Sequence, residues 1–196
     1  MREIRQILAS VPRLTLLDLD QAGLPYQDEE DALEPHPTFE QNARSKAAYF
    51  RVRSGLPTVA DDSGLEVHGL GGAPGVRSKR FAKVPDAVEE EARDRANTAH
   101  LLELLRGMPA DARTARYVCA VALDDGGAML TLRGESPGWI AEAPRGSGGF
   151  GYDPVFVDQE LGLTFAELSA EEKNARSHRG AAFRQLAARL LERAGA

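Results

Sequence analysis

The stretch Ala60-Asp61-Asp62-Ser63-Gly64-Leu65-Glu66-Val67 places two adjacent carboxylates directly after a short apolar run. The preceding residues 58–60 are typical of a strand, and Ser63 with Gly64 is typical of a turn. Strand ends that open into glycine-rich loops are where α/β proteins hold their ligands. Because neighbouring strand residues face opposite sides, only one of Asp61 and Asp62 can face a given cleft, and we favour Asp62. Taken alone, the stretch is more typical of a solvated turn, and other parts of the chain must favour a site.

Length and composition favour one domain over residues 1–196. The chain has 196 residues, with 42% hydrophobic and 28% charged, which is enough for a full core. A formal net charge of -6 argues against binding a nucleic acid polymer, although a local basic pocket still fits a phosphorylated small molecule. The single cysteine, Cys119, lies in an apolar run and indicates a buried core thiol in a reducing, cytoplasmic setting. We expect neither a membrane span nor a secretion signal.

Hydrophobic spacing and capping patterns predict alternating helices and strands. The predicted helices cover residues 2–9, 38–55, 86–107 and a final segment that begins at the capping box Ser169-x-x-Glu172. The predicted strands cover residues 14–17, 58–60, 117–123, 129–133, 139–141 and 155–157, with a hairpin turn at 124–127. This order indicates an α/β protein with a mixed sheet.

Polar residues of the first long helix are candidates for a metal and phosphate site. Glu40 lies in the first turn, where the helix dipole favours a carboxylate, and it is a possible metal ligand. Asn42 and Lys46 are four residues apart and share one face of that helix. The basic segment 77–81 faces either an anionic ligand or water.

The segment Gly146-Ser147-Gly148-Gly149-Phe150-Gly151 has the spacing of a dinucleotide fingerprint, but a strand rather than a helix is predicted to follow it. We therefore interpret it as a loop that brings backbone close to a ligand. Phe150 is available to stack on a planar ring and Asp153 to accept hydrogen bonds. The alternative is a hairpin with Phe150 in the core. Near the last capping box, Lys173, His178 and Arg179 form a cluster of possible cations beside Ser177.

Five blocks occur in one order along the chain: Ala60–Leu65, Gly71–Val76, Gly148–Pro154, Thr164–Leu168, and Glu172–Asn174 with Ser177–Gly180. Together with Thr38–Ala43 they resemble the inosine/xanthosine triphosphate pyrophosphatase family, which hydrolyses unusual purine nucleoside triphosphates. The resemblance covers nearly the whole chain. It implies a long twisted mixed β-sheet flanked by helices, bilobed with a central cleft, and a homodimer.

The resemblance also implies roles for individual residues. Asp62 is implied to be the general base or a ligand of Mg²⁺, which Glu40 also binds, while Ser63 and Lys173 bind phosphate. Phe150 is implied to stack on the base, with Gly151 and Tyr152 beside it, and Asp153, His178 and Arg179 to read the base edge. Donors that face a 6-oxo group would be left facing the donors of the 6-amino group of adenine, so an adenine nucleotide can be rejected by up to about 10⁴-fold. Discrimination against GTP is not explained.

The family's usual first strand and Ser/Thr-x-Asn-x-x-Lys phosphate loop are not found in this sequence, and we expect that the start codon was placed too late. Three alternatives stay open. One is a nucleotide-binding protein with impaired catalysis, and another is a septum-inhibitor-like pyrophosphatase for modified pyrimidine nucleotides, against which Ser177-His178-Arg179 argues. The third is a phosphatase with Asp18 as nucleophile, which Ala22 disfavours.

Overall fold

The computed structural model describes residues 2–85 and 87–194, and its chain divides into two compact units. Unit 1 comprises Met1–Asp62, Cys119–Gly134 and His178–Ala196, and unit 2 comprises Ser63–Val118 and Glu135–Ser177. The single domain stays a prediction, and the two units are described separately below. Among the described residues, no helix has both the length and the apolar composition that a membrane span needs.

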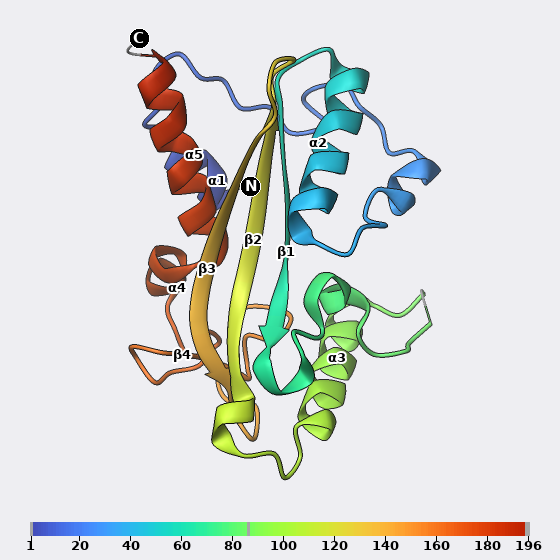
Figure 1. Ribbon diagram of the computed structural model, residues 1–196, viewed down its shortest axis with the longest axis vertical. Coiled ribbons are helices and arrows are strands. Elements are labelled where there is room, and N and C mark those ends of the chain that lie inside the picture. Colours follow the sequence, from blue (N-terminus) through green and yellow to red (C-terminus); the bar gives the residue numbers. More distant parts are fainter. Residues whose placement is uncertain (1, 86, 195–196) are drawn as a thin grey trace. The chain divides into compact units, whose positions relative to one another are not determined.

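A four-stranded sheet has the order β1-β2-β3-β4, formed by β1 (Thr58–Val67), β2 (Thr114–Asp124), β3 (Leu130–Ile140) and β4 (Phe156–Asp158). β3 and β4 pair antiparallel, with Gly138 opposite Asp158, and β1, β2 and β3 alternate in direction (Figure 1). The α/β class and the helix-flanked sheet are confirmed. The four described strands pair antiparallel, where we expected a mixed sheet.

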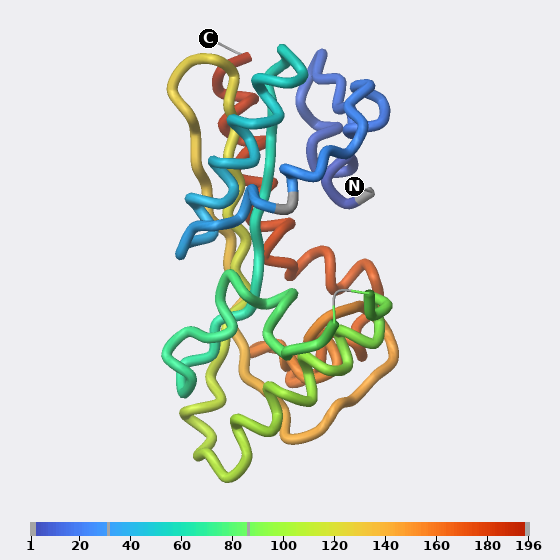
Figure 2. Tube along the Cα trace, turned by 90° about the vertical axis from the view of Figure 1, so that its right-hand side faces the viewer, coloured from blue at the N-terminus to red at the C-terminus, as the bar shows by residue number. Residues whose placement is uncertain are grey.

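Two strands are longer than the sequence predicted. β1 continues through Ser63 and Gly64, where we predicted a turn, because pairing within the sheet outweighs the local turn preference of these residues. β3 joins the two segments that we predicted as separate strands, and it includes the exposed Pro137. From Gly134 to Ile140 its residues alternate between buried and exposed, as expected for a strand with one covered face. β2 and β3 form the predicted hairpin, whose turn is the yellow bend in Figure 2.

Residues 14–17 do not form the predicted strand. Leu14 and Leu17 are 41% and 43% exposed, whereas Leu16 packs against the core of unit 1. Asp18 is therefore not a strand end: its carboxylate accepts a hydrogen bond from the Gln21 backbone in a turn.

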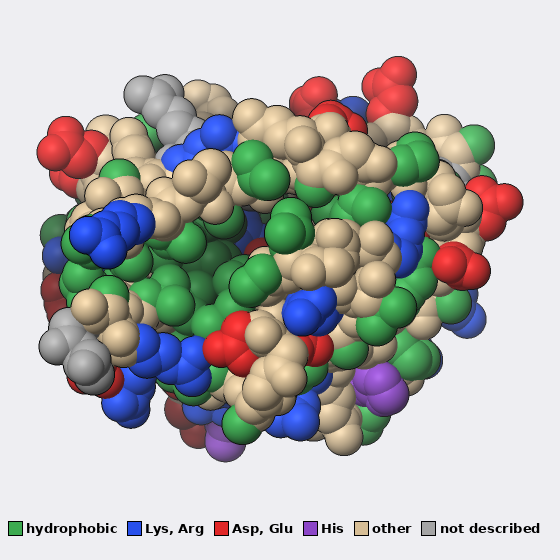
Figure 3. All heavy atoms as spheres, turned by 90° about the horizontal axis from the view of Figure 1, so that it is seen from above, with side chains coloured by type: hydrophobic (Ala, Val, Ile, Leu, Met, Phe, Trp, Pro, Cys, Tyr) green, Lys and Arg blue, Asp and Glu red, His purple; other side chains and the backbone are tan. Residues whose placement is uncertain are grey.

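Figure 3 shows hydrophobic side chains gathered in a hollow on the face seen from above, with Lys and Arg side chains near its margin.

Unit 1 contains α1 (Arg2–Leu8), α2 (Phe39–Ser54) and α5 (His178–Ala194), together with a short 3-10 helix at Asp28–Ala32. Its core joins α1 and α5 to β2 through the buried side chains Ile4, Leu8, Val11, Cys119, Val121, Leu123, Ala182, Phe183, Leu186 and Ala187. Cys119 is thus the core thiol that the sequence predicted. The predicted cap of α2 is also confirmed, because Thr38 accepts a hydrogen bond from the Gln41 backbone and Gly55 ends the helix at a φ of 69°.

Unit 2 contains α3 (Glu90–Leu104), α4 (Ala170–Arg176), β4 and three 3-10 helices at His68–Leu70, Gly75–Arg80 and Ala110–Arg113. The N-cap of α3 is Glu89, and the predicted capping residue Asp86 lies outside the described residues. The final helix is not continuous as predicted, since Ser177 is extended between α4 and α5. Ser136 donates a hydrogen bond to the carbonyl of Arg176, which satisfies one acceptor at the end of α4.

Arg113 is a buried cation that donates hydrogen bonds to three carbonyl groups of unit 2. Its guanidinium donates to the carbonyl oxygens of Ile140, Leu105 and Ala141 at 2.8, 2.9 and 2.6 Å. We expect Arg113→Met to lower the free energy of unfolding by about 3 kcal/mol, because the substitution leaves buried carbonyls without donors. Urea unfolding measures this loss. Arg106→Met is the control, since exposed Arg106 pairs with nearby Glu103 at the surface. Equal losses in the two variants would contradict the role of Arg113.

Candidate functional site

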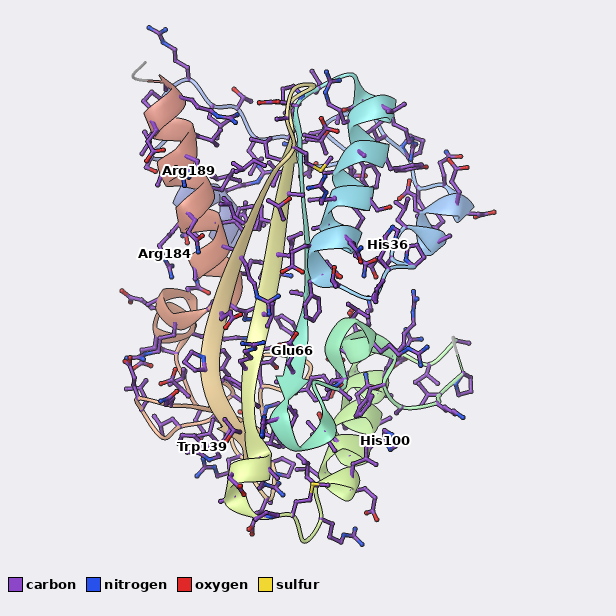
Figure 4. The ribbon with its side chains drawn as sticks, viewed as in Figure 1. His36, Glu66, His100, Trp139, Arg184 and Arg189 are labelled. Carbon is purple, nitrogen blue, oxygen red and sulfur yellow. The ribbon has the colours of Figure 1, made fainter. Side chains whose placement is uncertain are left out.

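Asp62 is a buried carboxylate of unit 1 whose neighbours come from α2. One of its oxygens, Oδ2, accepts a hydrogen bond from Asn42 Nδ2 at 3.0 Å, and Oδ1 lies 3.6 Å from Lys46 Nζ. Asn42 is fully buried, and its Oδ1 accepts the backbone N–H of His36 at 2.9 Å. His36 lies beside the start of α2 (Figure 4). The shared helix face predicted for Asn42 and Lys46 is therefore the face that meets Asp62.

Asp61 has a separate set of neighbours, as expected from strand alternation. Its Oδ2 accepts a hydrogen bond from Arg179 Nε at 3.1 Å, and Arg179 Nη2 forms an ion pair with the same oxygen at 3.1 Å. Cys119 Sγ lies 3.7 Å from this oxygen. Arg179 belongs to α5, whereas the partners of Asp62 belong to α2. The two adjacent carboxylates thus contact different helices of unit 1.

Glu40 pairs with a cation from the sheet. Its Oε1 lies 2.7 Å from Arg133 Nη1. Partial burial raises the pKa of Glu40, but the hydrogen bond and charge of Arg133 outweigh it, and the net pKa is lowered. Glu40 is therefore ionised at neutral pH, as a metal ligand must be. In the part of the chain that the structure describes, no three His, Cys, Asp or Glu side chains are grouped to hold a metal ion.

The glycine-rich loop of unit 2 presents Phe150 to solvent, with 69% of the residue exposed. The alternative that placed Phe150 in the core is therefore wrong. A turn and β4 follow the loop, so it is not a dinucleotide fingerprint. Asp153 Oδ2 accepts the backbone N–H of Phe150 at 2.7 Å. Gly149 has a φ of 74°, and a Cβ there would lie 2.1 Å from the same oxygen, so this turn requires glycine.

Lys173 joins this loop from α4. Its ammonium lies 2.5 Å from Asp153 Oδ2 and 4.5 Å from the centre of the Phe150 ring. Burial raises the pKa of Asp153 by more than the charge of Lys173 and the hydrogen bonds lower it. Phe150, Asp153 and Lys173 form one cluster that combines an exposed aromatic face, a carboxylate and a cation.

Gly151 and Tyr152 make contacts within unit 2. The Gly151 N–H donates to Asp94 Oδ2 at 2.7 Å, and the buried Tyr152 hydroxyl donates to the carbonyl of Ser78 at 2.8 Å. These bonds fasten the loop to α3 and to the neighbouring 3-10 helix. A hollow of about 990 Å³ lies between α3 and the loop, and Phe150 and Gly151 are among the residues that line it.

The predicted cluster of three cations is divided between the units. Lys173 belongs to α4 of unit 2, whereas His178 and Arg179 belong to α5 of unit 1. Ser63, half-buried, follows Asp62 in β1 and is the first residue of unit 2. From the basic segment 77–81, Arg80 lines a hollow of about 530 Å³ with Lys83 and Arg93.

The sequence model of the Ham1 family matches residues 1–189. The chain belongs to the Ham1 family. It is 48% identical over 189 residues to a dITP/XTP pyrophosphatase of Mycolicibacterium paratuberculosis, a match that covers 95% of this chain and 88% of the relative. It is 53% identical over 162 residues to a dITP/XTP pyrophosphatase of Aromatoleum aromaticum, covering 82% of this chain and 78% of the relative.

Solved structures of Ham1 proteins have the same fold. The Staphylococcus aureus Ham1 protein matches with a TM-score of 0.85 at 31% identity, over 98% of this chain and 95% of that chain. A HAM1 protein from Coxiella burnetii matches with a TM-score of 0.84 at 36% identity, over 97% of this chain and 92% of that chain. The family resemblance read from the sequence blocks is therefore confirmed.

Sequence reasoning left several residues of this Ham1 chain out of the candidate site. Asn42 was placed on the correct helix face, but no sequence signal showed that its amide binds Asp62. The contacts of Asp61 with Arg179 and of Gly151 with Asp94 join residues far apart in the chain. Strand alternation separated Asp61 from Asp62, but it did not reveal the partner of either.

Proposed function

We propose that this Ham1 chain hydrolyses unusual purine nucleoside triphosphates, namely ITP, dITP and XTP, to the monophosphate and pyrophosphate. Such a reaction removes these compounds from the nucleotide pool. The observation that carries the proposal is the Asp62 carboxylate, which is buried, bonded to Asn42 and near the Lys46 ammonium. Relatives that are 48% and 53% identical are named dITP/XTP pyrophosphatases, which supports dITP and XTP as substrates.

In the proposed reaction, water attacks the α-phosphorus and the bond to the bridging oxygen breaks, so that pyrophosphate leaves. Asp62 accepts the proton of the attacking water as general base, or it binds the metal ion. Asn42 holds Oδ2 of the carboxylate in place, and Oδ1 lies on the side of Lys46. Lys46 and Ser63 bind phosphate oxygens of the substrate, and Lys173 contributes a further cation.

The carboxylate oxygens of Asp62 and Glu40 are ligands of the type that Mg²⁺ prefers. Mg²⁺ prefers oxygen ligands and is usually held by one or two carboxylates together with substrate phosphates and water. A group of three acidic side chains is therefore not required. When bound, Mg²⁺ would offset the negative charge of the triphosphate. The chain carries a net charge of -6, so an ion of this kind favours binding of an anionic substrate.

Recognition of the base is assigned to Phe150, Asp153, His178 and Arg179. Phe150 has the exposed ring needed to stack on a purine, and Asp153 and Lys173 lie against it. Gly151 and Tyr152 shape the loop that presents this ring. His178 and Arg179 donate to the 6-oxo group. The homodimer and the cytoplasmic location stay predictions.

The test is release of pyrophosphate by the full chain with Mg²⁺ from ITP, dITP, XTP, GTP and ATP. We expect kcat/KM for ITP and XTP to exceed that for ATP by at least about 100-fold, because the amino group of adenine cannot accept from the donors of His178 and Arg179. Chelation of the metal should remove the activity, and added Mg²⁺ should restore it. Binding of ITP without pyrophosphate release would favour an impaired nucleotide-binding protein. A preference for modified pyrimidine nucleotides would favour the septum-inhibitor-like alternative.

A further inference from the structure

We propose that Asp61 is a positioning residue for Arg179 and thereby sets the discrimination between 6-oxo and 6-amino purines. The inference rests on the proposed function, in which Arg179 donates to the 6-oxo group. It gives the two adjacent carboxylates different tasks: Asp62 serves hydrolysis, and Asp61 serves recognition of the base.

The geometry of the pair fixes the orientation of the guanidinium. Two of its donors, Nε and Nη2, converge on one oxygen of Asp61 at 3.1 Å. The guanidinium is planar and rigid, so a hydrogen bond from Nε and an ion-pair contact from Nη2 along one edge restrict the plane and direction of the whole group. Bonds between charged partners are also stronger than neutral ones. An arginine fixed in this way presents its donors in one direction, as discrimination between an oxygen and an amino group requires.

The surroundings favour the pairing of Asp61 with Arg179. The side chains of Asp61 and Arg179 are 22% and 33% exposed, so water competes only partly for their charges. The third neighbour, Cys119, is a neutral thiol, because burial, and to a lesser extent the nearby Asp61 charge, raises its pKa. A neutral thiol can donate to the carboxylate but cannot replace it as a counter-ion for Arg179. Loss of Asp61 would therefore leave a partly buried guanidinium without this partner.

The position of the Arg179 backbone is restricted by close packing of α5 on β3. A Cβ on Gly134 of β3 would lie 2.2 Å from the carbonyl oxygen of His178 and 2.4 Å from the amide nitrogen of Ala182. The first turn of α5 therefore lies directly on the backbone of β3. With the helix start fixed by β3 and the guanidinium fixed by Asp61 of β1, little freedom is left to the donors of Arg179.

The proposal predicts that Asp61→Asn changes base selectivity rather than hydrolysis. We expect kcat/KM for ITP to fall about 10- to 100-fold, mainly through KM, while kcat/KM for ATP changes little. The ratio of kcat/KM for ITP to kcat/KM for ATP should fall by the same factor. Arg179→Ala should show the same pattern, and the Asp61→Asn, Arg179→Ala double variant should be no worse than Arg179→Ala alone. Arg189→Ala is the matched control, because Arg189 lies on the same helix and pairs with Glu192 at the surface (Figure 4).

An equal fall in kcat for ITP and ATP with an unchanged ratio would overturn the proposal, since Asp61 would then act in hydrolysis. Additive losses in the double variant would also overturn it. Melting temperatures identify a variant that does not fold. If Asp61→Asn does not fold, Arg179→Lys takes its place, because lysine keeps the charge but lacks the planar pair of donors. An unchanged ratio of kcat/KM for ITP to kcat/KM for ATP in that variant would contradict the proposal. Failure of the proposed function is seen separately, as a wild-type chain that releases no pyrophosphate from ITP.

Discussion

Replacing Asp62 by asparagine is expected to lower kcat for ITP by about 10²- to 10⁴-fold, the usual contribution of a general base. Asparagine has nearly the same shape, and its side-chain oxygen can still accept the hydrogen bond from Asn42 Nδ2. What the variant loses is the negative charge beside Lys46 and the ability to accept a proton. The loss should therefore be seen in kcat, measured as pyrophosphate release, while the melting temperature stays within a few degrees of the wild-type value.

Asp111→Asn provides the matched control for this prediction. Asp111 is an exposed carboxylate in the 3-10 helix before β2, and we expect its substitution to leave kcat unchanged. A Mg²⁺ titration of the Asp62 variant separates the two roles left open for this residue. Recovery of kcat at high Mg²⁺ indicates a metal ligand, and a constant deficit indicates a general base. An Asp62→Asn chain with wild-type kcat would refute the assignment of catalysis to this residue.

The sequence predicted those parts of the fold that local chemistry decides. The capping boxes at Thr38 and Ser169 start their helices, and the apolar run around Cys119 is a buried strand. The same local reasoning failed at Ser63 and Gly64, because the hydrogen bonds that keep β1 straight come from β2, more than 45 residues away. It also failed at Ser177, where the carbonyl before the break between α4 and α5 accepts its hydrogen bond from Ser136 of β3, 40 positions away.

The candidate site was predicted in its residues but not in its contacts. Strand alternation was enough to place Asp61 and Asp62 on different faces. Glu40 could be identified as a first-turn carboxylate, but its ion pair with Arg133 joins residues 93 positions apart and has no signal in the spacing. Phe150 was left undecided, because an aromatic residue among glycines is compatible with both the core and the surface. Only the turn that Asp153 closes, by accepting the Phe150 N–H, places the ring in solvent.

Gly134→Ala is expected to have the largest effect on the stability of unit 1. A Cβ there would lie 2.2 and 2.4 Å from backbone atoms of α5, and neither atom can rotate away as a side chain could. The strand and the helix must separate, and overpacking of this kind costs about 1–3 kcal/mol, occasionally more. We expect a loss of about 3 kcal/mol in the free energy of unfolding, measured by urea denaturation. The matched control is Gly127→Ala in the β2–β3 turn, where the nearest atom is the flexible Asp125 Oδ1 at 3.3 Å and we expect a small change.

The same substitution should also weaken base recognition, because the atoms that it displaces belong to the turn that carries His178 and Arg179. A shift of about 1 Å in a binding group can cost about 10²-fold in kcat/KM. At a temperature where the Gly134→Ala chain is still folded, we therefore expect kcat/KM for ITP to fall more than kcat/KM for ATP. A variant that loses stability but keeps the wild-type ratio of ITP to ATP would show that the start of α5 does not govern selectivity. That result would separate the packing role of Gly134 from the positioning role of Asp61, since the side-chain pair with Arg179 would then be sufficient by itself.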